Sequence, residues 1–394
     1  MRHFFSIAVC AVFILCVASA SSATSNVTFA MIHDFDGVDG DSPYAGLVLA
    51  SDGNLYGTTS QGGPGFGAGT IFRITPGGAF TTLHTFHGND GDSPGAPLIQ
   101  GVDGDLYGTT ESGGKSNASC QYGCGVIFKV TMQGAYTTLH RFVGTDGAYP
   151  YGGLAQSRDG TLYGTTQYHG KFNFGTVFKL SPSGQLTTMH NFGGGDGTYP
   201  FAGLILATNG SLYGMTDAGG RYGHGTVFRI TTAGRFWTIH NFNGNDGGYP
   251  RDALVQANDG TLYGTTEYGV DPGGRYFGTV FKITPGGTLT LLHTFNGKDG
   301  ANPYAGLTLG GDGFLYGTTL NGGLNNYGSI YRISPTGQFT SVYSFQNSQA
   351  YPFAGLVRGA IGTFYGTTYE GGSNACGGFF CGMVFRLSVG PVTP

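Results

Sequence analysis

The sequence predicts an all-β chain that folds as a single seven-bladed β-propeller with four-stranded blades. The pattern Leu-Tyr-Gly-Thr-Thr recurs seven times along 394 residues, with single changes in the fourth and seventh copies, and its tyrosines are Tyr56, Tyr107, Tyr163, Tyr213, Tyr263, Tyr316 and Tyr365. Each copy has short β-branched and aromatic runs between glycine-rich turns. The 76 glycines fall at corresponding places in the copies, as turn residues do. A repeat of about 50 residues made of short strands is typical of propeller blades.

The first twenty residues differ from the repeats. Arg2 and His3 precede an apolar run over residues 4–17, and Ala18-Ser19-Ala20 follows. A basic start, an apolar run of this length and an A-x-A site indicate a signal peptide over residues 1–20. The alternative is a membrane anchor, which requires about 20 apolar residues. No second apolar span follows, so we expect a secreted or periplasmic protein without a membrane span once the signal is removed.

Residues 21–394 form the propeller in this prediction. Residues 27–35 match only the outer strand of a repeat, whereas the last repeat lacks its outer strand. The first strand can therefore complete the last blade, and this one-plus-three closure joins the ring by ladder hydrogen bonds without a long free edge. The predicted blades lie near residues 45–86, 96–142, 152–192, 202–242, 252–295, 305–345 and 354–388.

Each blade has four predicted strands, and the third blade shows the pattern. Its strands cover residues 153–156, 162–166, 175–180 and 186–192, and they are joined by a hairpin turn at Asp159-Gly160, a longer loop and a turn at 181–184. The longer loops vary among the blades and share one face of the ring, here called the loop-rich face, with the connections between blades. Because binding usually uses variable loops on a rigid scaffold, we expect the site on this face.

Four motifs recur in the same order: Leu-Tyr-Gly-Thr-Thr, Gly-Thr-Val-Phe-Lys-Ile, Leu-His-x-Phe and Asp-Gly-x-x-Pro. Over residues 27–389 this combination resembles the GloVer tandem-repeat family, which consists of exported, mostly bacterial repeat proteins. The resemblance implies export and a repeated β architecture, and it implies no catalytic residues. The chain stops at Gly390-Pro-Val-Thr-Pro394 without the anchoring module that the family often carries. Secretion or periplasmic retention is therefore favoured over surface tethering.

The composition and the cysteines limit which classes of partner and metal the protein is expected to bind. Only 10% of the residues are charged, the net charge is −4 and no run of lysine and arginine occurs, which argues against nucleic acid as a partner. After the signal, four cysteines remain as the close pairs Cys120/Cys124 and Cys376/Cys381, in the same loop of blades two and seven. In an exported chain we favour two disulfides. Zinc is the alternative, but no histidine lies at ligand spacing from either pair.

Histidines and aspartates recur around the ring. A catalytic or metal role does not need six equivalent copies, so we interpret the histidines as hydrogen-bonding residues between blades and the aspartates as caps of their own turns. No cofactor is predicted. Calcium at Asp36, Asp39 and Asp41 is the alternative, although the full calcium-loop signature is missing. The repeated residues are His33, His84, His140, His190, His240 and His293, with Tyr343 in the seventh outer strand, and Asp39, Asp90, Asp146, Asp196, Asp246 and Asp299.

Aromatic residues beside a repeated proline are the main ligand candidates. They should lie near the mouth of the central channel, where rings can stack on sugars, although packing between blades is the alternative. Blade five breaks the pattern with a charged pair, and blade two has Gly95-Ala96-Pro97 there. The predicted ligand-binding residues are Tyr44, Tyr151, Phe201, Tyr249, Arg251, Asp252, Tyr304 and Phe353. Neighbouring loops add Glu111, Tyr168, His169, Lys171, Asp217, Arg221, Tyr222, His224, Glu267 and Glu370.

Three functions are compatible with these residues. The favoured one is a secreted propeller that binds an extracellular ligand, in first place a glycan, on the loop-rich face. The second is a polysaccharide hydrolase or lyase, which needs Arg251, Asp252 and the loops of blades three and four to converge. The third is a structural or protein-interaction propeller with a plugged channel. The sequence identifies no catalytic residue.

Overall fold

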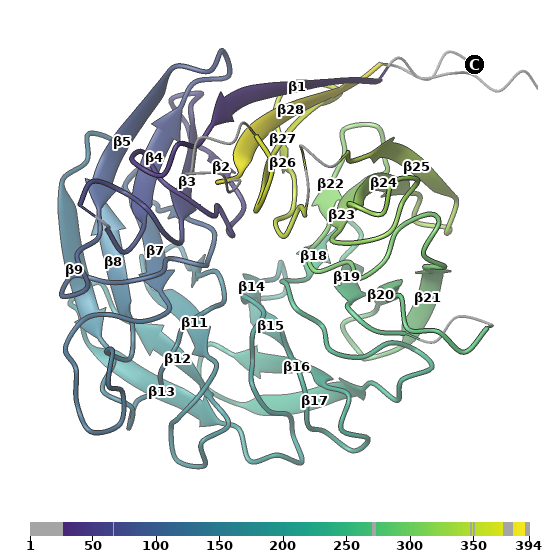
Figure 1. Cartoon of the computed structure of the whole chain (residues 1–394). Helices are drawn as coiled ribbons and strands as arrows, with labels where there is room; N and C mark the ends of the chain where they lie inside the picture. The colour runs from purple at the N-terminus through teal and green to yellow at the C-terminus, as the bar shows by residue number, and fades with distance from the viewer. Residues whose placement is uncertain are drawn as a thin grey trace, which may run out of the picture.

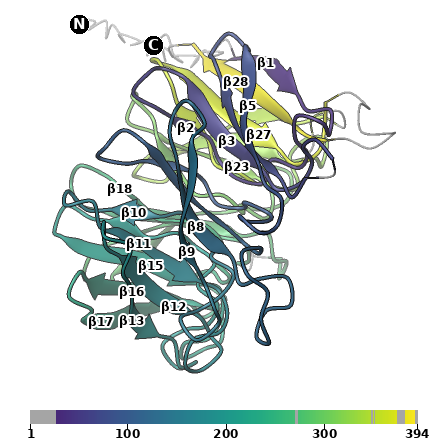
Figure 2. The same cartoon turned by 90° about the vertical axis from the view of Figure 1, so that its left-hand side faces the viewer.

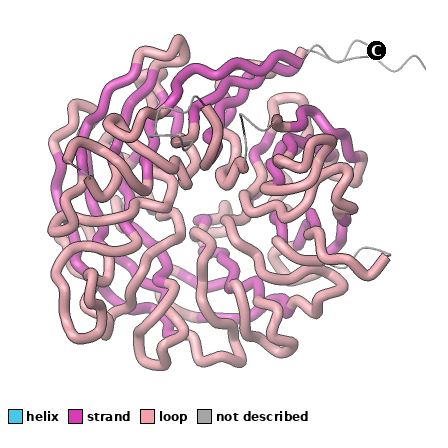
Figure 3. The backbone as a smooth tube through the Cα atoms, viewed as in Figure 1, coloured by secondary structure: helices cyan, strands magenta, loops and turns pink. Residues whose placement is uncertain are grey.

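The strands β1 to β28 make up the regular structure, and they form seven four-stranded antiparallel sheets arranged in a ring (Figure 1). The computed structural model describes residues 27–65, 67–269, 273–346, 349, 351–372 and 381–390. This part of the chain contains strands and loops but no α-helix, as Figure 3 shows, and accordingly no helix in it could span a membrane. The seven-bladed propeller is therefore confirmed. The predicted signal peptide lies outside the described residues.

Every blade runs from a short strand at the channel to a long strand at the rim. The innermost strands are β2 (Val48–Leu49), β6 (Ile99–Gln100), β10 (Ala155–Gln156), β14 (Ile205–Leu206), β18 (Val255–Gln256), β22 (Thr308–Leu309) and β26 (Val357–Arg358). The second strands are β3 (Leu55–Thr59), β7 (Leu106–Thr110), β11 (Leu162–Thr166), β15 (Ser211–Thr216), β19 (Leu262–Thr266), β23 (Leu315–Thr319) and β27 (Thr363–Thr368). The third strands are β4 (Thr70–Ile74), β8 (Val126–Val130), β12 (Thr176–Leu180), β16 (Thr226–Thr231), β20 (Thr279–Ile283), β24 (Ser329–Ile333) and β28 (Met383–Val389). The outer strands are β5 (Phe80–Thr85), β9 (Tyr136–Arg141), β13 (Leu186–Asn191), β17 (Phe236–Asn241), β21 (Leu289–Thr294), β25 (Phe339–Ser344) and β1 (Val27–Asp34).

The seventh blade joins the two ends of the chain. Its sheet has the order β1-β28-β27-β26, so the first strand supplies the outer edge of the last blade. The register runs antiparallel from Val27 opposite Val389 to Asp34 opposite Met383. Figures 1 and 2 both show β1 beside β28. This is the one-plus-three closure that the sequence predicts.

The glycine of the repeated Leu-Tyr-Gly-Thr-Thr pattern makes room for an aromatic ring. Gly57 pairs across the ladder with Phe72 of the third strand. A Cβ atom at Gly57 would lie 2.6 Å from Phe72 Cζ and 2.7 Å from Leu47 Cδ2. The phenyl ring therefore packs directly on the backbone of the second strand. Phe72 is fully buried, as are its counterparts Phe128, Phe178, Phe228, Phe281, Tyr331 and Phe385.

The first threonine of the pattern ties each blade to the next. The Thr165 hydroxyl donates to the carbonyl of Ala202 at 3.1 Å, and equivalent bonds join the other blades that have threonine here. Thr367 donates to the carbonyl of Ala45 at 3.2 Å and so links blade seven to blade one. Blade four has Met215 at this position, which is fully buried and has no hydroxyl to donate.

The recurring histidines hold the loop that follows their own strand. In six blades His Nε2 lies 2.8 to 3.0 Å from an aspartate Oδ2, and the pairs are His33–Asp39, His84–Asp90, His140–Asp146, His190–Asp196, His240–Asp246 and His293–Asp299. The other carboxylate oxygen caps the turn as predicted, for example by accepting the Gly193 N–H at 2.8 Å. The expected hydrogen bond between blades is replaced by ring stacking, as between His190 and Phe236 at 3.8 Å. Because Nε2 of the imidazole already bonds to the aspartate of the turn, the flat face of the ring packs against the neighbouring blade.

We expect acid to weaken the fold as Asp196 and Asp246 become protonated. Burial raises the pKa of Asp246, but hydrogen bonds from His240 and the Asn243 N–H outweigh it, so the pKa lies below its usual value. A depressed carboxyl pKa stabilises the folded state above about pH 3.9, and this stabilisation is lost as the pH falls through the folded-state value. The urea midpoint of the wild type should therefore fall below about pH 4. In Asp246→Asn the fall should be smaller, and an identical pH dependence would contradict the interpretation.

A disulfide joins Cys120 and Cys124, whose Cα atoms are 5.2 Å apart. Cys381 is also disulfide-bonded, and its predicted partner Cys376 lies outside the described residues. The second cysteine of each pair occupies the same place in the repeat. The Cys124 carbonyl accepts the Tyr149 N–H at 2.9 Å, and the Cys381 carbonyl accepts the Ser42 N–H at the same distance. The disulfide between Cys120 and Cys124 thus steadies a loop that is hydrogen-bonded to the start of the next blade.

Candidate binding site at the channel mouth

The residue before each repeated proline fixes the course of the chain into the channel. Tyr199 shows the pattern: its N–H donates to the Phe174 carbonyl of the preceding blade at 2.9 Å, and its carbonyl accepts the Asp217 N–H at 3.0 Å. Both bonds recur in all seven blades. A left-handed φ at a non-glycine residue costs on the order of 1 kcal/mol, and here two hydrogen bonds hold it. The φ angles lie between 54° and 61° at Ser42, Ser93, Tyr149, Tyr199, Tyr249, Asn302 and Tyr351.

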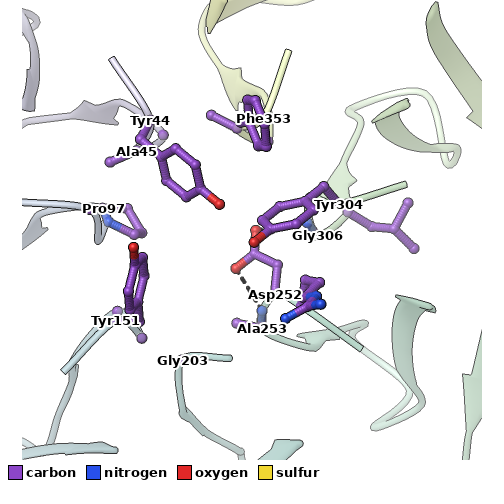
Figure 4. Close-up of a pocket in the computed structure, with 18 of the residues that line it drawn as sticks. Tyr44, Ala45, Pro97, Tyr151, Gly203, Asp252, Ala253, Tyr304, Gly306 and Phe353 are labelled. Atoms are coloured by element: carbon purple, nitrogen blue, oxygen red, sulfur yellow. Dashed lines mark hydrogen bonds between the residues drawn. The ribbon is translucent and has the colours of Figure 1, made fainter. Parts of the chain in front are cut away.

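Five aromatic side chains that directly follow these prolines meet over the channel. Tyr44 stacks on Phe353 with ring centroids 4.8 Å apart, and Tyr151 stacks on Phe201 at 4.4 Å. Tyr304 meets Tyr44, Phe353 and Phe201 edge-on. Figure 4 shows several of these rings around a cavity of about 260 Å³. The structure therefore brings these five predicted aromatic residues together, each half-buried and from a different blade.

Blade two has a glycine at the position where its neighbours have a ring. A Cβ atom at Gly95 would lie 3.2 Å from Tyr151 Cε1 and 4.0 Å from Tyr44 Cδ1. The ring centroids of these two tyrosines, which come from blades one and three, are 6.3 Å apart. They occupy the space that the missing side chain leaves.

Blade five contributes a cation instead of a ring. The Arg251 guanidinium lies over Phe201 at 5.3 Å and over Tyr304 at 5.6 Å. Its Nε donates to Glu267 Oε2 at 2.7 Å, and its Nη1 lies 3.2 Å from Asp217 Oδ1. Burial lowers the pKa of Arg251, but the two carboxylates outweigh burial and raise the pKa, so the guanidinium stays charged.

Asp217 is a buried carboxylate beside the mouth whose pKa lies well above its usual value. It is only 13% exposed, and no described residue donates a hydrogen bond to it, because its contact with Arg251 lacks hydrogen-bond geometry. Burial raises the pKa of Asp217 to about 6, with Glu267 raising it further and Arg251 lowering it. A buried acid that titrates near neutral pH beside a cavity is typical of functional sites.

Asp252 places a carboxylate in the channel cavity. Its oxygens accept the N–H groups of Ala253 and Gly306, each at 2.7 Å, and Gly306 belongs to blade six (Figure 4). Burial raises the pKa of Asp252, and the two backbone N–H groups partly offset this. At four other blade interfaces, a threonine of the preceding blade donates to the carbonyl of the residue at this position. Blade four has Met215 instead, so both departures from the pattern lie at one interface between blades.

Tyr249 lies apart from the other predicted residues. Seven of the eight line the channel cavity, whereas Tyr249 lines a neighbouring pocket between blades four and five. The cause is its place before the proline, where the left-handed backbone directs it away from the channel, unlike the residue after the proline. Arg251 lines both spaces.

Several residues of the mouth were not assigned a role from the sequence. The residue after the second threonine stands at the channel-mouth end of the second strand in every blade, and it is Ser60, Glu111, Gln167, Asp217, Glu267, Leu320 or Tyr369. Glu111 accepts a hydrogen bond from the Tyr151 hydroxyl at 2.7 Å. In the sequence, the carboxylates of the mouth could have been found as charged residues that directly follow the last threonine of the repeated pattern. Tyr268 and Tyr276, which line the neighbouring pocket, were missed altogether.

The acidic cluster suggested for calcium forms a turn. Asp36 Oδ1 accepts the N–H groups of Val38 and Asp39, and Asp39 Oδ2 pairs with His33. Within the described ranges, no group of three or more histidine, cysteine, aspartate or glutamate side chains is arranged to hold a metal ion.

Comparison with known proteins gives a family and a fold. A profile of the Gloeobacter/Verrucomicrobia repeat matches residues 19–209 and 202–380. No curated protein matches the chain.

Among solved structures, an extracellular domain of a putative hybrid two component system from B. thetaiotaomicron is similar, with a TM-score of 0.59 and 13% identity over 90% of this chain and 39% of that one. A GH74 enzyme of Niastella koreensis is similar with a TM-score of 0.55 and 16% identity, over 80% of this chain and 47% of that one. This chain therefore spans less than half the length of either protein, and the likeness shows the fold.

Proposed function

The chain belongs to the Gloeobacter/Verrucomicrobia repeat family, and we propose that this member is an exported propeller that binds an extracellular glycan at the channel mouth of its loop-rich face. The convergence of five aromatic rings from five blades on one cavity carries the proposal. Rings with tyrosine hydroxyls can stack on sugar rings and contact their hydroxyl groups. Export is supported by the predicted signal peptide and by the disulfide between Cys120 and Cys124.

The charges of the mouth suit a ligand that is largely uncharged and rich in hydroxyl groups. Arg251 is held in ion pairs by Asp217 and Glu267, and Asp252 is held by two backbone N–H groups, so each charged group already has partners within the protein. Tyr44 and Tyr304 offer hydroxyl groups among the rings. Sugars need this combination of apolar faces and a few placed polar groups.

We expect the mature protein to migrate more slowly in native gels that contain its polysaccharide than in gels without it. Tyr44→Ala removes the ring that contacts Tyr151, Tyr304 and Phe353. Loss of one stacking ring should weaken binding about tenfold, because such a contact contributes about 1 kcal/mol or more. Tyr122→Ala is the matched control, since Tyr122 is 74% exposed on a loop of the same face. Unchanged mobility in a broad panel of polysaccharides would favour a protein-interaction propeller.

One observation favours a polysaccharide hydrolase or lyase as a second candidate. Asp217, with a pKa of about 6, stands beside Arg251 and Glu267 and can give or take a proton near neutral pH. Such an enzyme should leave a cleared track behind the retarded band and release new reducing ends. Asp217→Asn should then abolish clearing but retain the retardation. Retardation without clearing would leave a binding protein.

A further inference from the structure

A separate pocket of about 490 Å³ lies beside the channel mouth, between blades four and five. Tyr249, Tyr268, Tyr276 and His224 line it together with Asp217. Arg251 forms the wall that the pocket shares with the channel cavity, and no other described residue lines both. The pocket is therefore a distinct space that a ligand could occupy independently of the channel.

The rings of this pocket stand at steep angles to one another. Tyr249 and Tyr268 have centroids 5.2 Å apart at 71°, and Tyr249 and His224 have centroids 5.8 Å apart at 85°. Tyr268 and Tyr276 remain 38% and 60% exposed, so their surfaces are accessible from outside. Aromatic faces carry negative charge density, and rings placed around a small space attract a cation.

The charged groups around the pocket also favour a cation. Asp217 and Arg251 line the pocket, and Glu267, which does not line it, also pairs with Arg251. These three groups together carry one negative charge in excess when both carboxylates are ionised. Glu267 accepts the short bond from Arg251 Nε, and Asp252 accepts two N–H groups. Asp217 is the one of these three carboxylates that receives no hydrogen bond from the described residues. Buried polar atoms in this state are usually satisfied by water or a ligand.

We propose that this pocket binds a protonated amine, whose ammonium group donates hydrogen bonds to Asp217 and lies against the faces of Tyr249, Tyr268 and Tyr276. The recognised chemistry is a compact ammonium on a partly apolar frame. The amino group of a deacetylated amino sugar and a free alkylamine both supply it. An acetylated amine fails, because it has lost the positive charge. The pocket is separate from the channel mouth, so this inference stands or falls apart from the proposed function.

Isothermal titration calorimetry of the full chain with glucosamine oligomers, N-acetylglucosamine oligomers of equal length and cadaverine tests the proposal. We expect the glucosamine oligomers to bind at least tenfold more tightly than the acetylated ones. Binding of cadaverine as well would show that the ammonium group alone is sufficient for recognition. If cadaverine does not bind while the glucosamine oligomers do, the site is specific for amino sugars. Absence of binding by either amine, or equal binding of the acetylated oligomers, would overturn the proposal.

Variants locate the site. Asp217→Asn keeps the shape of the side chain and should weaken amine binding at least tenfold, whereas Asp259→Asn removes the same charge from an exposed turn and should have no effect. Tyr276→Ala alters an exposed ring, so folding is not at risk, and should weaken binding several-fold. Tyr44→Ala should leave amine binding unchanged while it impairs the channel mouth. Wild-type affinity in both Asp217→Asn and Tyr276→Ala would refute the assignment.

Discussion

Gly175→Ala is expected to lower the free energy of unfolding by at least about 3 kcal/mol, although it adds a single methyl group. Gly175 directly precedes the third strand of blade three, β12, and has a φ of +90°. A Cβ atom there would lie 2.3 Å from the Thr166 carbonyl oxygen and 2.7 Å from Pro200 Cδ. The first of these atoms is ladder backbone and the second starts the next blade, so neither can move without disturbing the contact between two blades.

Gly184→Ala is the matched control for this substitution. Gly184 also has a positive φ, of +83°, but a Cβ atom there meets nothing within 4 Å. The control variant should lose only about 1 kcal/mol from backbone strain. Urea unfolding of the two variants and the wild type would measure the difference. Equal losses of unfolding free energy in both variants would show that close packing between blades does not cause the destabilisation of Gly175→Ala. The same geometry recurs at Gly69, Gly125, Gly225, Gly278, Gly328 and Gly382.

Deletion of β1 is expected to be the most damaging change to the ring. β1 pairs along its length with β28, and Phe29 stacks on Tyr343 at 4.5 Å and on Phe385 at 5.1 Å. Without β1, the strand that carries Phe385 and Leu387 becomes a free edge with an uncovered apolar face. A chain that starts at Phe35 should lose at least about 4 kcal/mol of a total stability on the order of 5–15 kcal/mol.

Size-exclusion chromatography and urea unfolding check this prediction. The truncated chain should unfold at lower urea and elute in part as aggregates. A synthetic peptide of residues 27–34 should restore the midpoint when added in excess, because it can pair with β28 in the native register. A peptide with Phe29→Asp should not restore it. A truncated chain with the wild-type midpoint would refute the role of closure.

The fold could be predicted because its determinants repeat. Each blade needs the same tyrosine, glycine and threonines, so seven copies of the pattern fixed the number of blades. The position of residues 27–35 against the incomplete last repeat predicted the closure that Val27 and Val389 show. The role of the histidines was predicted less well. Stacking of His190 on Phe236 depends on how two blades meet, and a repeated residue type does not encode that contact.

The candidate site could be predicted only in part. The residues after the prolines were correctly placed together at the channel, because equivalent positions in a ring must face a common axis. Tyr249 was placed with them, yet one residue before the proline the backbone is left-handed and the side chain enters another space. The pairing of Arg251 with Asp217 and Glu267 joins three residues from two blades, and only the geometry between blades reveals it.

Each blade places one residue at the channel mouth, always the residue after the proline. The residues are Tyr44, Gly95, Tyr151, Phe201, Arg251, Tyr304 and Phe353. The pattern that builds a blade lies elsewhere in the repeat, in the tyrosine, glycine and threonines of the second strand. Evolution can therefore change what the mouth recognises through single codons, one blade at a time, while the scaffold is inherited unaltered. Protein engineers can use the same separation, because exchanging one repeat for another replaces one wall of the mouth and conserves the other six.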